Sequence, residues 1–172
     1  MAAAVGRKAP AFRLPAADGE EVALADFAGR TVVLYFYPKD NTSGCTREAC
    51  DFRDAHARIV RRGAVVLGVS PDSVRSHAGF REKHDLPFPL LSDADHEAAR
   101  AYGVWVKKSL YGRESMGVER ATFVIGPDGV VRAAFRKVKV AGHVDEVLAA
   151  LADRPPAGAP RKRDLRGRPR RG

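Results

Sequence analysis

The sequence contains few cysteines, with only Cys45 and Cys50 among its 172 residues. Two cysteines cannot build the multiple disulfides that stabilise small secreted domains, and a chain of this length buries enough apolar surface to fold without cross-links. No stretch approaches the roughly 18 apolar residues of a membrane span, and the segment Met1 to Pro10 lacks the apolar core of a signal peptide. We therefore expect one cytoplasmic domain, in a compartment whose reducing conditions return oxidised cysteines to their thiol form.

The sequence also lacks the usual patterns of nucleotide and metal sites. No glycine-rich phosphate loop is present, so nucleotide binding has no support. The histidines show no i, i+4 pairing, and two cysteines with such histidines do not make a convincing zinc site. These histidines are His56, His77, His84, His96 and His143. We expect neither a cofactor nor a metal.

Both cysteines lie where a buried strand is expected to lead into a helix. The run from Thr31 to Tyr37, TVVLYFY, is β-branched and aromatic throughout, which indicates a strand buried on both faces of a sheet. Pro38 ends this strand, and the turn-prone residues after it bring the chain out at the carboxyl edge of the sheet, where open α/β sheets bind ligands. From Thr46 to Gly63 the apolar spacing is helical. Cys45 is therefore expected in or just before the first helical turn.

The position of Cys45 has a chemical consequence. The free N–H groups and the positive dipole end of a helix favour the thiolate, which is the reactive form of cysteine. Thr42 and Ser43 lie just before Cys45, so their hydroxyl groups and nearby backbone N–H groups can converge on an oxygen that the sulfur attacks. Either residue can also serve as a helix cap. Spacing alone leaves both roles open, and the two roles can coexist.

Cys50 follows Cys45 by five residues. On a helix this spacing separates the two Cα atoms by about 8 to 9 Å, whereas a disulfide needs less than about 7 Å. The two sulfurs can bond only if the first turns of the helix unwind. A Cys45–Cys50 disulfide is therefore expected as a transient product of catalysis.

The rest of the chain predicts a single α/β domain. Strands are expected at Ala64 to Ser70, at Ala121 to Ile125 and at Val130 to Phe135, with a hairpin turn at Gly126 to Gly129. Helices are expected from Ser73 to about Asp85, from Ala94 to Tyr102 and from about His143 to Ala152, and a loop is expected from Gly103 onward with Trp105, Lys107 and Lys108. The aromatic residues Tyr35 to Tyr37 and Trp105 are interpreted as core. Together these elements fit a central mixed sheet flanked by helices.

The pattern Pro38-x-x-x-Thr42-x-x-Cys45 resembles the active-site signature of the peroxiredoxins, which are thiol peroxidases with a thioredoxin-like fold. The Cys45-x4-Cys50 spacing resembles the peroxiredoxin Q branch, also called bacterioferritin comigratory protein. The resemblance covers about residues 5 to 152. It extends to Ala9-Pro10-Ala11-Phe12-Arg13-Leu14-Pro15, Asp18-Gly19, Val69-Ser70-Pro71-Asp72, Leu90-Leu91-Ser92-Asp93, Tyr102-Gly103-Val104-Trp105 and Arg120-Ala121-Thr122-Phe123-Val124-Ile125.

The resemblance implies a role for each residue of the motif. Cys45 would be the peroxidatic nucleophile, which attacks the O–O bond of a hydroperoxide and becomes a sulfenic acid. Cys50 would be the resolving thiol, whose attack on that sulfenic acid gives an intramolecular disulfide. Thr42 would bind the peroxide oxygen and the thiolate, and Pro38 would shield the sulfur from water. Arg120 would hold the thiolate and polarise the peroxide.

The resemblance also implies partners, and it has one departure. Hydrogen peroxide and organic hydroperoxides would be the substrates, thioredoxin or a similar dithiol would reduce the disulfide, and the protein would be a monomer because resolution within one chain needs no partner subunit.

The family most often has a proline where Ser43 stands. Since proline pre-sets the backbone at a helix start, its loss is expected to affect how readily the site unwinds, and hence the rate rather than the type of reaction.

The C-terminal segment has a different composition from the rest of the chain. Residues 152–172 carry +6 of the total formal charge of +9, together with several prolines and almost no apolar side chains. Such a segment cannot offset the entropy of ordering, so 153–172 is predicted to be a flexible tail outside a domain spanning 1–152. Polyanions can attract it weakly, but a solvated appendage without a dedicated partner is the favoured interpretation.

Two other functions remain open at this point. A thiol–disulfide oxidoreductase on the same fold would have two cysteines two residues apart, close enough to bond without unwinding, and the wider spacing of Cys45 and Cys50 argues against it. A nucleic-acid-associated protein would act through the basic tail and leave the domain catalytically idle. The sequence favours the peroxidase over both.

Overall fold

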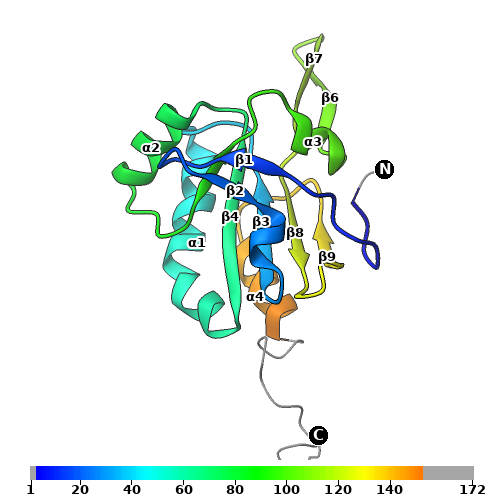
Figure 1. Ribbon diagram of the computed structural model, residues 1–172. Coiled ribbons are helices and arrows are strands. Elements are labelled where there is room, and N and C mark those ends of the chain that lie inside the picture. Colours follow the sequence, from blue (N-terminus) through cyan, green and yellow to red (C-terminus); the bar gives the residue numbers. More distant parts are fainter. Residues whose placement is uncertain (1–2, 153–172) are drawn as a thin grey trace, which may run out of the picture.

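The structure of the protein is a computed structural model that describes residues 3–152 (Figure 1). Its centre is a mixed sheet with the strand order β5-β4-β3-β8-β9, in which β3 and β4 and also β4 and β5 are parallel and the other pairs are antiparallel. These strands are β3 (Thr31–Phe36), β4 (Ala64–Ser70), β5 (Leu90–Ser92), β8 (Ala121–Ile125) and β9 (Val131–Phe135). The tail expected at 153–172 lies outside the described residues.

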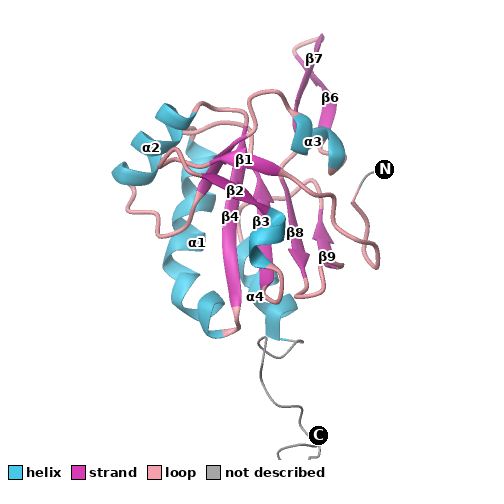
Figure 2. Cartoon of the chain, viewed as in Figure 1, coloured by secondary structure: helices cyan, strands magenta, loops and turns pink. Residues whose placement is uncertain are grey.

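Helices and two small hairpins surround this sheet (Figure 2). The helices are α1 (Ser43–Arg61), α2 (Val74–Lys83), α3 (Glu97–Ala101) and α4 (His143–Ala152), with a short 3-10 turn, η1 (Leu24–Phe27). One hairpin joins β1 (Arg13–Pro15) to β2 (Glu21–Ala23), and the other joins β6 (Trp105–Leu110) to β7 (Arg113–Val118). The second hairpin projects from the body of the molecule in Figure 1.

The central strand β3 has no exposed face, as its composition predicts. All six of its residues are buried, and alternate side chains enter two separate apolar clusters. Val33 and Tyr35 pack with side chains of α1, α2 and α4, whereas Leu34 and Phe36 pack with the N-terminal segment and α3. The sheet therefore lies between two layers, and its carboxyl edge at Tyr37 is fixed by packing on both sides.

Close packing explains the glycine in the middle of β4. A Cβ added to Gly68 would lie 2.9 Å from Cδ2 of Leu90 and 3.0 Å from the ring of Tyr35. Tyr35 stacks on Phe52 of α1, with ring centroids 4.6 Å apart, so it has little freedom to move. Gly68 therefore lets the large aromatic side chain lie flat between sheet and helix.

The structure confirms most of the expected elements. The strands at Ala64–Ser70 and Ala121–Ile125 and the helix at His143–Ala152 have the predicted bounds. Ser73 caps α2, because its side chain accepts a hydrogen bond from the backbone N–H of Ser76. The aromatic run on β3 is core, as interpreted.

Three expectations about the elements are wrong or incomplete. The segment from Trp105 to Leu110 is not a loop, because it pairs with Arg113–Val118 in an antiparallel hairpin. The helix expected from Ala94 to Tyr102 is shortened to α3, since His96 adopts a left-handed φ of 60° just before it. The strands β1, β2 and β5 were not expected, and each has only three residues.

The helices of the described part of the chain are too short or too polar to cross a membrane.

Candidate active site

The end of β3 and the start of α1 place Cys45 at the carboxyl edge of the sheet. Pro38 is half-buried just beyond the strand, and α1 begins at Ser43. Cys45 is the third residue of this helix and is only 2% exposed, with its side chain in the apolar cluster that includes Ala49 and Phe52. The positive end of the helix dipole lies close to the sulfur, and apolar neighbours limit the contact of the sulfur with water.

Arg120 reaches the same sulfur from the start of β8, which pairs with the end of β3. It lies between β7 and β8, and its Nη2 donates a hydrogen bond to Sγ of Cys45 at 3.4 Å. Its Nη1 donates to Oε1 of Glu48 at 2.6 Å. A Cβ on Gly44 would lie 3.3 Å from Nη2, so the glycine before Cys45 leaves room for the guanidinium. One cation therefore connects the cysteine and a carboxylate of the same helix.

Glu48 is a fully buried carboxyl group that sequence reasoning missed. Its side chain is 0% exposed, and burial raises the pKa of Glu48 to about 7, although the ion pair with Arg120 acts in the opposite direction. Burial outweighs pairing because only one oxygen is paired. Among the described residues, Glu48 Oε2 and the Tyr35 hydroxyl are buried polar atoms without a hydrogen-bond partner. Glu48 is three residues after Cys45, so helical spacing was the signal that could have revealed it.

Thr42 lies at the N-cap position of α1, but its side chain does not cap the helix. The hydroxyl is exposed and donates a hydrogen bond to the backbone carbonyl of Lys39 at 2.9 Å. This bond holds Thr42 against the loop that leads from Pro38 to the helix. Ser43 is the exposed first residue of the helix. Of the two roles left open for Thr42, the structure does not support side-chain capping.

A second cation approaches the site from the β6–β7 hairpin. The side chain of Lys108 lies against Gly117, where an added Cβ would be 3.1 Å from Cδ of the lysine. Burial and the positive charge of Arg120 lower the pKa of Lys108, whereas the negative charges of Cys45 and Glu119 act in the opposite direction. Lys108 therefore lies in the electrostatic field of the cysteine, although its sequence position suggested only a loop.

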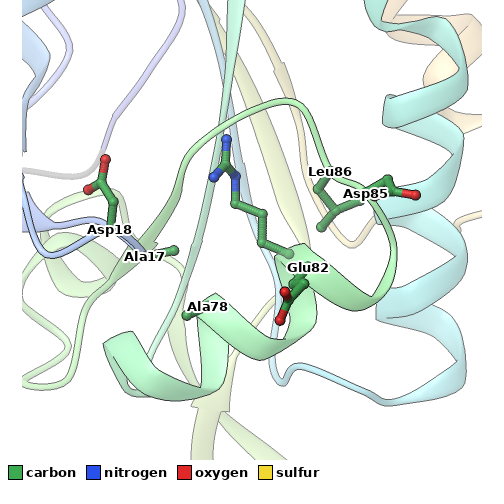
Figure 3. A pocket seen from close by; sticks show the side chains of 7 residues that line it. Ala17, Asp18, Ala78, Glu82, Asp85 and Leu86 are labelled. Atoms are coloured by element: carbon green, nitrogen blue, oxygen red, sulfur yellow. The ribbon is translucent and has the colours of Figure 1, made fainter.

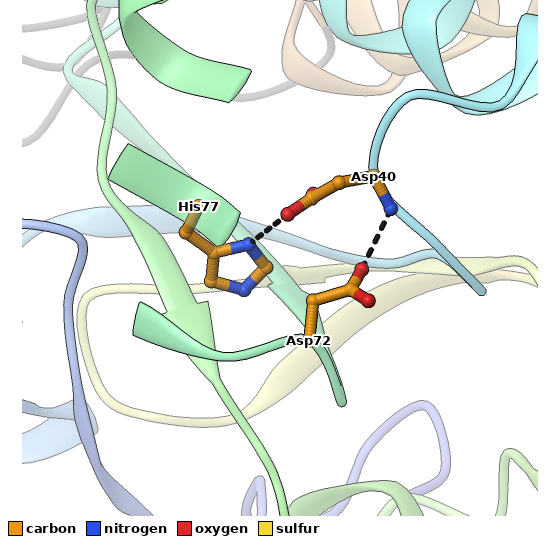
Figure 4. A group of neighbouring side chains, drawn as sticks. All are labelled: Asp40, Asp72 and His77. Atoms are coloured by element: carbon orange, nitrogen blue, oxygen red, sulfur yellow. Dashed lines mark hydrogen bonds and ion pairs between the residues drawn. The ribbon is translucent and has the colours of Figure 1, made fainter. Parts of the chain in front are cut away.

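A buried polar cluster anchors the loop before Thr42 (Figure 4). Asp40 accepts hydrogen bonds from the Tyr37 hydroxyl at 2.6 Å, from the Ser76 hydroxyl at 2.8 Å and from Nδ1 of His77 at 2.7 Å. Its backbone N–H donates to Asp72 at 2.6 Å. The loop is thus tied to the end of β4 and to α2.

His77 completes this cluster. Its Nδ1 faces the Asp40 carboxylate and its Nε2 faces the backbone carbonyl of Leu91 at 3.0 Å, so each ring nitrogen has an oxygen within hydrogen-bonding distance. The bonds of His77 and of two hydroxyl groups lower the pKa of Asp40, although its burial opposes this effect. Ligand atoms of Asp40, Asp72 and His77 lie within 4.8 Å of one another, but the facing oxygens already accept protein hydrogen bonds. The arrangement therefore suits an anchor better than a cation site.

Cys50 lies on the same continuous helix as Cys45, and both cysteines are free. Cys45 is buried and Cys50 is half-buried. In this state the helix separates the two sulfurs, as the spacing predicts, so a bond between them requires the start of α1 to unwind.

A separate pocket of about 560 Å³ lies beside α2 and the turn after β1 (Figure 3). Its lining residues are Ala17, Asp18, Ala78, Arg81, Glu82, Asp85 and Leu86. None of them belongs to the group around Cys45, so this pocket is not part of the candidate active site.

Comparison with known proteins identifies the family of the chain. The family model described as the AhpC/TSA family matches residues 5–134. The chain belongs to the AhpC/TSA family of peroxiredoxins. The putative peroxiredoxin Bcp of Coxiella burnetii is 51% identical over 151 residues, which cover 88% of this chain and 100% of that protein. Peroxiredoxin Bcp of Bacillus subtilis is 51% identical over 153 residues, which cover 89% of this chain and 98% of that protein.

The peroxiredoxin fold is confirmed by solved structures. The bacterioferritin comigratory protein of Xanthomonas campestris, studied for its alkyl peroxide reduction activity, superposes with a TM-score of 0.82 at 44% identity. The match covers 87% of this chain and 98% of that chain. The resemblance to the peroxiredoxin Q branch and the thioredoxin-like fold are thus confirmed, and this peroxiredoxin is a thiol-dependent peroxidase.

Proposed function

We propose that Cys45 is the peroxidatic cysteine of this enzyme. The observation that carries the proposal is the bridge that Arg120 makes between Cys45 and Glu48 at a helix N-terminus. The thiolate attacks the terminal oxygen of the hydroperoxide, the O–O bond breaks, and the products are a sulfenic acid and, after protonation, an alcohol or water. The Arg120 guanidinium stabilises the thiolate first and then the negative charge that develops on the peroxide oxygens.

Pro38 and Thr42 complete the proposed site. Pro38, half-buried beside the cysteine loop, limits the access of water to the sulfur. The Thr42 hydroxyl donates its hydrogen to Lys39 and so offers its oxygen lone pairs to a peroxide O–H, which would orient the substrate toward the sulfur.

Cys50 is proposed as the resolving cysteine, and thioredoxin or a similar dithiol as the reductant. The two cysteines are placed on one chain and one helix, so resolution needs no second subunit, which supports a monomer. The requirement for a dithiol in each cycle supports a cytoplasmic location. Hydrogen peroxide and organic hydroperoxides are the proposed substrates, and the alkyl peroxide reduction activity of the Xanthomonas campestris relative supports the second group.

The deciding experiment measures peroxide consumption with thioredoxin, thioredoxin reductase and NADPH. Cys45→Ser is expected to abolish turnover, and Cys50→Ser to form the sulfenic acid but no intramolecular disulfide. Arg120→Gln is expected to lower the rate of sulfenic acid formation by about 10² to 10³ fold, because it removes a charged donor from the reacting atoms. Arg132→Gln is the matched control. Arg132 lies on β9 and pairs with Asp128 in the turn between β8 and β9, so this variant should consume peroxide at the wild-type rate.

Two results would contradict the assignment. Full turnover by Cys45→Ser would remove Cys45 from the reaction. A wild-type protein that consumes no peroxide but reduces a protein disulfide would be a thiol–disulfide oxidoreductase instead, and the roles of Thr42 and Arg120 would then have no basis.

A further inference from the structure

Cys50 lies at the contact between α1 and α2, where it meets a histidine. Its Sγ is 3.9 Å from Nδ1 of His84, the C-cap residue of α2, and both side chains are half-buried. The two residues are 34 positions apart in the sequence, so only the packing of the two helices brings them together. A histidine beside a cysteine is the arrangement that activates thiols in many enzymes.

Neighbouring residues hold this pair in place. Arg53, one turn after Cys50, donates from Nη1 to the backbone carbonyl of His84 at 2.9 Å. The ring of Phe80 packs edge-on against the imidazole, with centroids 5.2 Å apart. The backbone of His84 is therefore fixed by α1 and its ring is fixed by α2, so that Nδ1 remains directed at the sulfur.

Charged side chains lie near this cysteine–histidine pair. The guanidinium of Arg53 interacts electrostatically with Cys50, and it also binds Asp54 at 3.0 Å. Asp85, the residue after His84, is the other charged group in the field of Arg53. The Arg53 guanidinium and the His84 imidazole thus lie near the thiol. The carboxylates of Asp54 and Asp85 interact electrostatically with Arg53.

We propose that His84 is the general base of the resolving step. This inference rests on the proposed roles of Cys45 and Cys50. Nδ1 of His84 takes the proton from Sγ of Cys50, and the resulting thiolate attacks the sulfur of the Cys45 sulfenic acid. An S–S bond forms, the S–O bond breaks, and the departing hydroxide takes up the proton to give water, so one thiol and one sulfenic acid yield one disulfide and one water.

The contacts of α1 also indicate which cysteine moves. Arg53 fixes the helix just after Cys50 to α2, and Asp40 fixes the loop before Thr42. The segment between these anchors contains Cys45, so unwinding carries the sulfenic acid toward a Cys50 that stays beside His84.

The test uses His84→Asn in the full chain and measures both chemical steps in the same rapid-quench samples. Hydrogen peroxide is the oxidant, dimedone traps the sulfenic acid, and mass spectrometry counts the disulfide. The ratio of the disulfide rate to the sulfenic acid rate is expected to fall at least tenfold near pH 7 and to recover with added imidazole. His96→Asn is the matched control, because His96 stacks on Trp105, far in sequence from both cysteines, and asparagine tolerates its left-handed φ.

A second measurement does not depend on unwinding. In a Cys45→Ser background, Cys50 is the remaining cysteine, and its rate of alkylation by iodoacetamide reports the thiolate. His84→Asn should lower this rate at pH 7 and leave it unchanged above about pH 9.5, where a free thiol is ionised without help.

Each outcome decides the proposal. If both the disulfide rate and the alkylation rate of Cys50 match wild type in His84→Asn, the base assignment is wrong while the peroxidase roles stand. If wild type forms sulfenic acid but no Cys45–Cys50 disulfide, the proposed role of Cys50 fails, and the role of His84 fails with it.

Discussion

Arg120 is the residue on which the charges of the site depend. It is the cation that hydrogen-bonds both Cys45 and Glu48, and its side chain is only 17% exposed. When the cysteine is a thiolate and Glu48 is ionised, two negative charges share one guanidinium in a poorly solvated space. Protonation of Glu48 removes one of them and leaves the charge of Arg120 for the sulfur.

Glu48→Gln is expected to change the pH dependence of stability. The pKa of Glu48 is 4.5 in its ordinary state and about 7 in the folded protein. The native state therefore holds this proton more tightly than the unfolded chain, so Glu48 makes the free energy of unfolding fall as pH rises from about 5 to 7, with no further change above that. The variant lacks this slope and should gain on the order of 3 kcal/mol relative to wild type between pH 5 and pH 8.

Urea unfolding at several pH values measures this difference. The exposed Glu82, changed to glutamine, provides the control and should give a curve parallel to wild type. A Glu48→Gln curve that is also parallel to wild type would show that Glu48 is ionised in the folded protein throughout this range.

At this scale the sequence predicts only part of the site. Cys45 could be predicted from the strand-to-helix pattern, because the N-terminus of a helix favours the reactive thiolate. Arg120 is one of 30 basic residues, and only the family resemblance distinguishes it. The contacts Asp40–His77 and Cys50–His84 each join residues more than 30 positions apart, and no local pattern encodes such contacts.

Among the structural elements, the loop between β3 and α1 depends on a buried ion pair. His77→Leu is expected to lower the free energy of unfolding by about 3 to 5 kcal/mol at pH 7, because it leaves the Asp40 carboxylate buried without a counter-charge. The lowered pKa of Asp40 means that its stabilising contribution is present at neutral pH and lost as pH falls below its ordinary range. The cost of the substitution should therefore shrink as pH falls below about 3.8.

Urea unfolding at pH 7 and at about pH 3 tests this expectation, with His56→Leu on the half-buried face of α1 as the control. Equal costs for the two variants at pH 7, or an equal cost for His77→Leu at both pH values, would mean that the pair contributes packing and not charge.

In the proposed cycle, the first turn of α1 must unwind before the two cysteines can meet. Ser43→Pro is expected to stabilise this turn by about 0.4 to 1 kcal/mol, because proline suits the first helical position. Thr42, with φ −87° and ψ 156°, already has the extended backbone that a following proline requires. Disulfide formation should then be slowed about two- to fivefold in stopped-flow experiments, with Ser43→Ala as the control. A Ser43→Pro rate equal to that of Ser43→Ala would show that unwinding does not limit the step.

Elements with a strong apolar pattern were predictable, and the others were not. The strands β3, β4 and β8 are buried on both faces, so unbroken apolar runs mark them. The β6–β7 hairpin is mostly exposed and rich in charged side chains, and its turn at Tyr111 and Gly112 has positive φ angles without a usual turn sequence. Its pairing arises from the register between two polar segments, which periodicity does not reveal.

For the whole molecule, the charge is concentrated at one end of the sequence. Residues 152–172 carry most of the net charge of +9, whereas the site around Cys45 lies within 38–120. Removing 153–172 is expected to leave kcat and KM for hydrogen peroxide within about twofold of wild type and to reduce any salt-dependent retention on a polyanion column. Turnover assays and column elution on the two proteins measure both effects. A loss of turnover in the shortened chain would make the tail part of the catalytic unit.

In the proposed cycle, the single unbroken helix that carries both cysteines also sets the reduction potential of the Cys45–Cys50 disulfide. The folded first turns of α1 and the disulfide cannot exist together, so the free energy of folding those turns opposes the disulfide. For a two-electron couple, each 1.4 kcal/mol of this competition raises the reduction potential by about 30 mV. Formation of the disulfide therefore requires the free energy of unwinding the first turns of α1. That free energy is released again when a dithiol reduces the disulfide and α1 refolds.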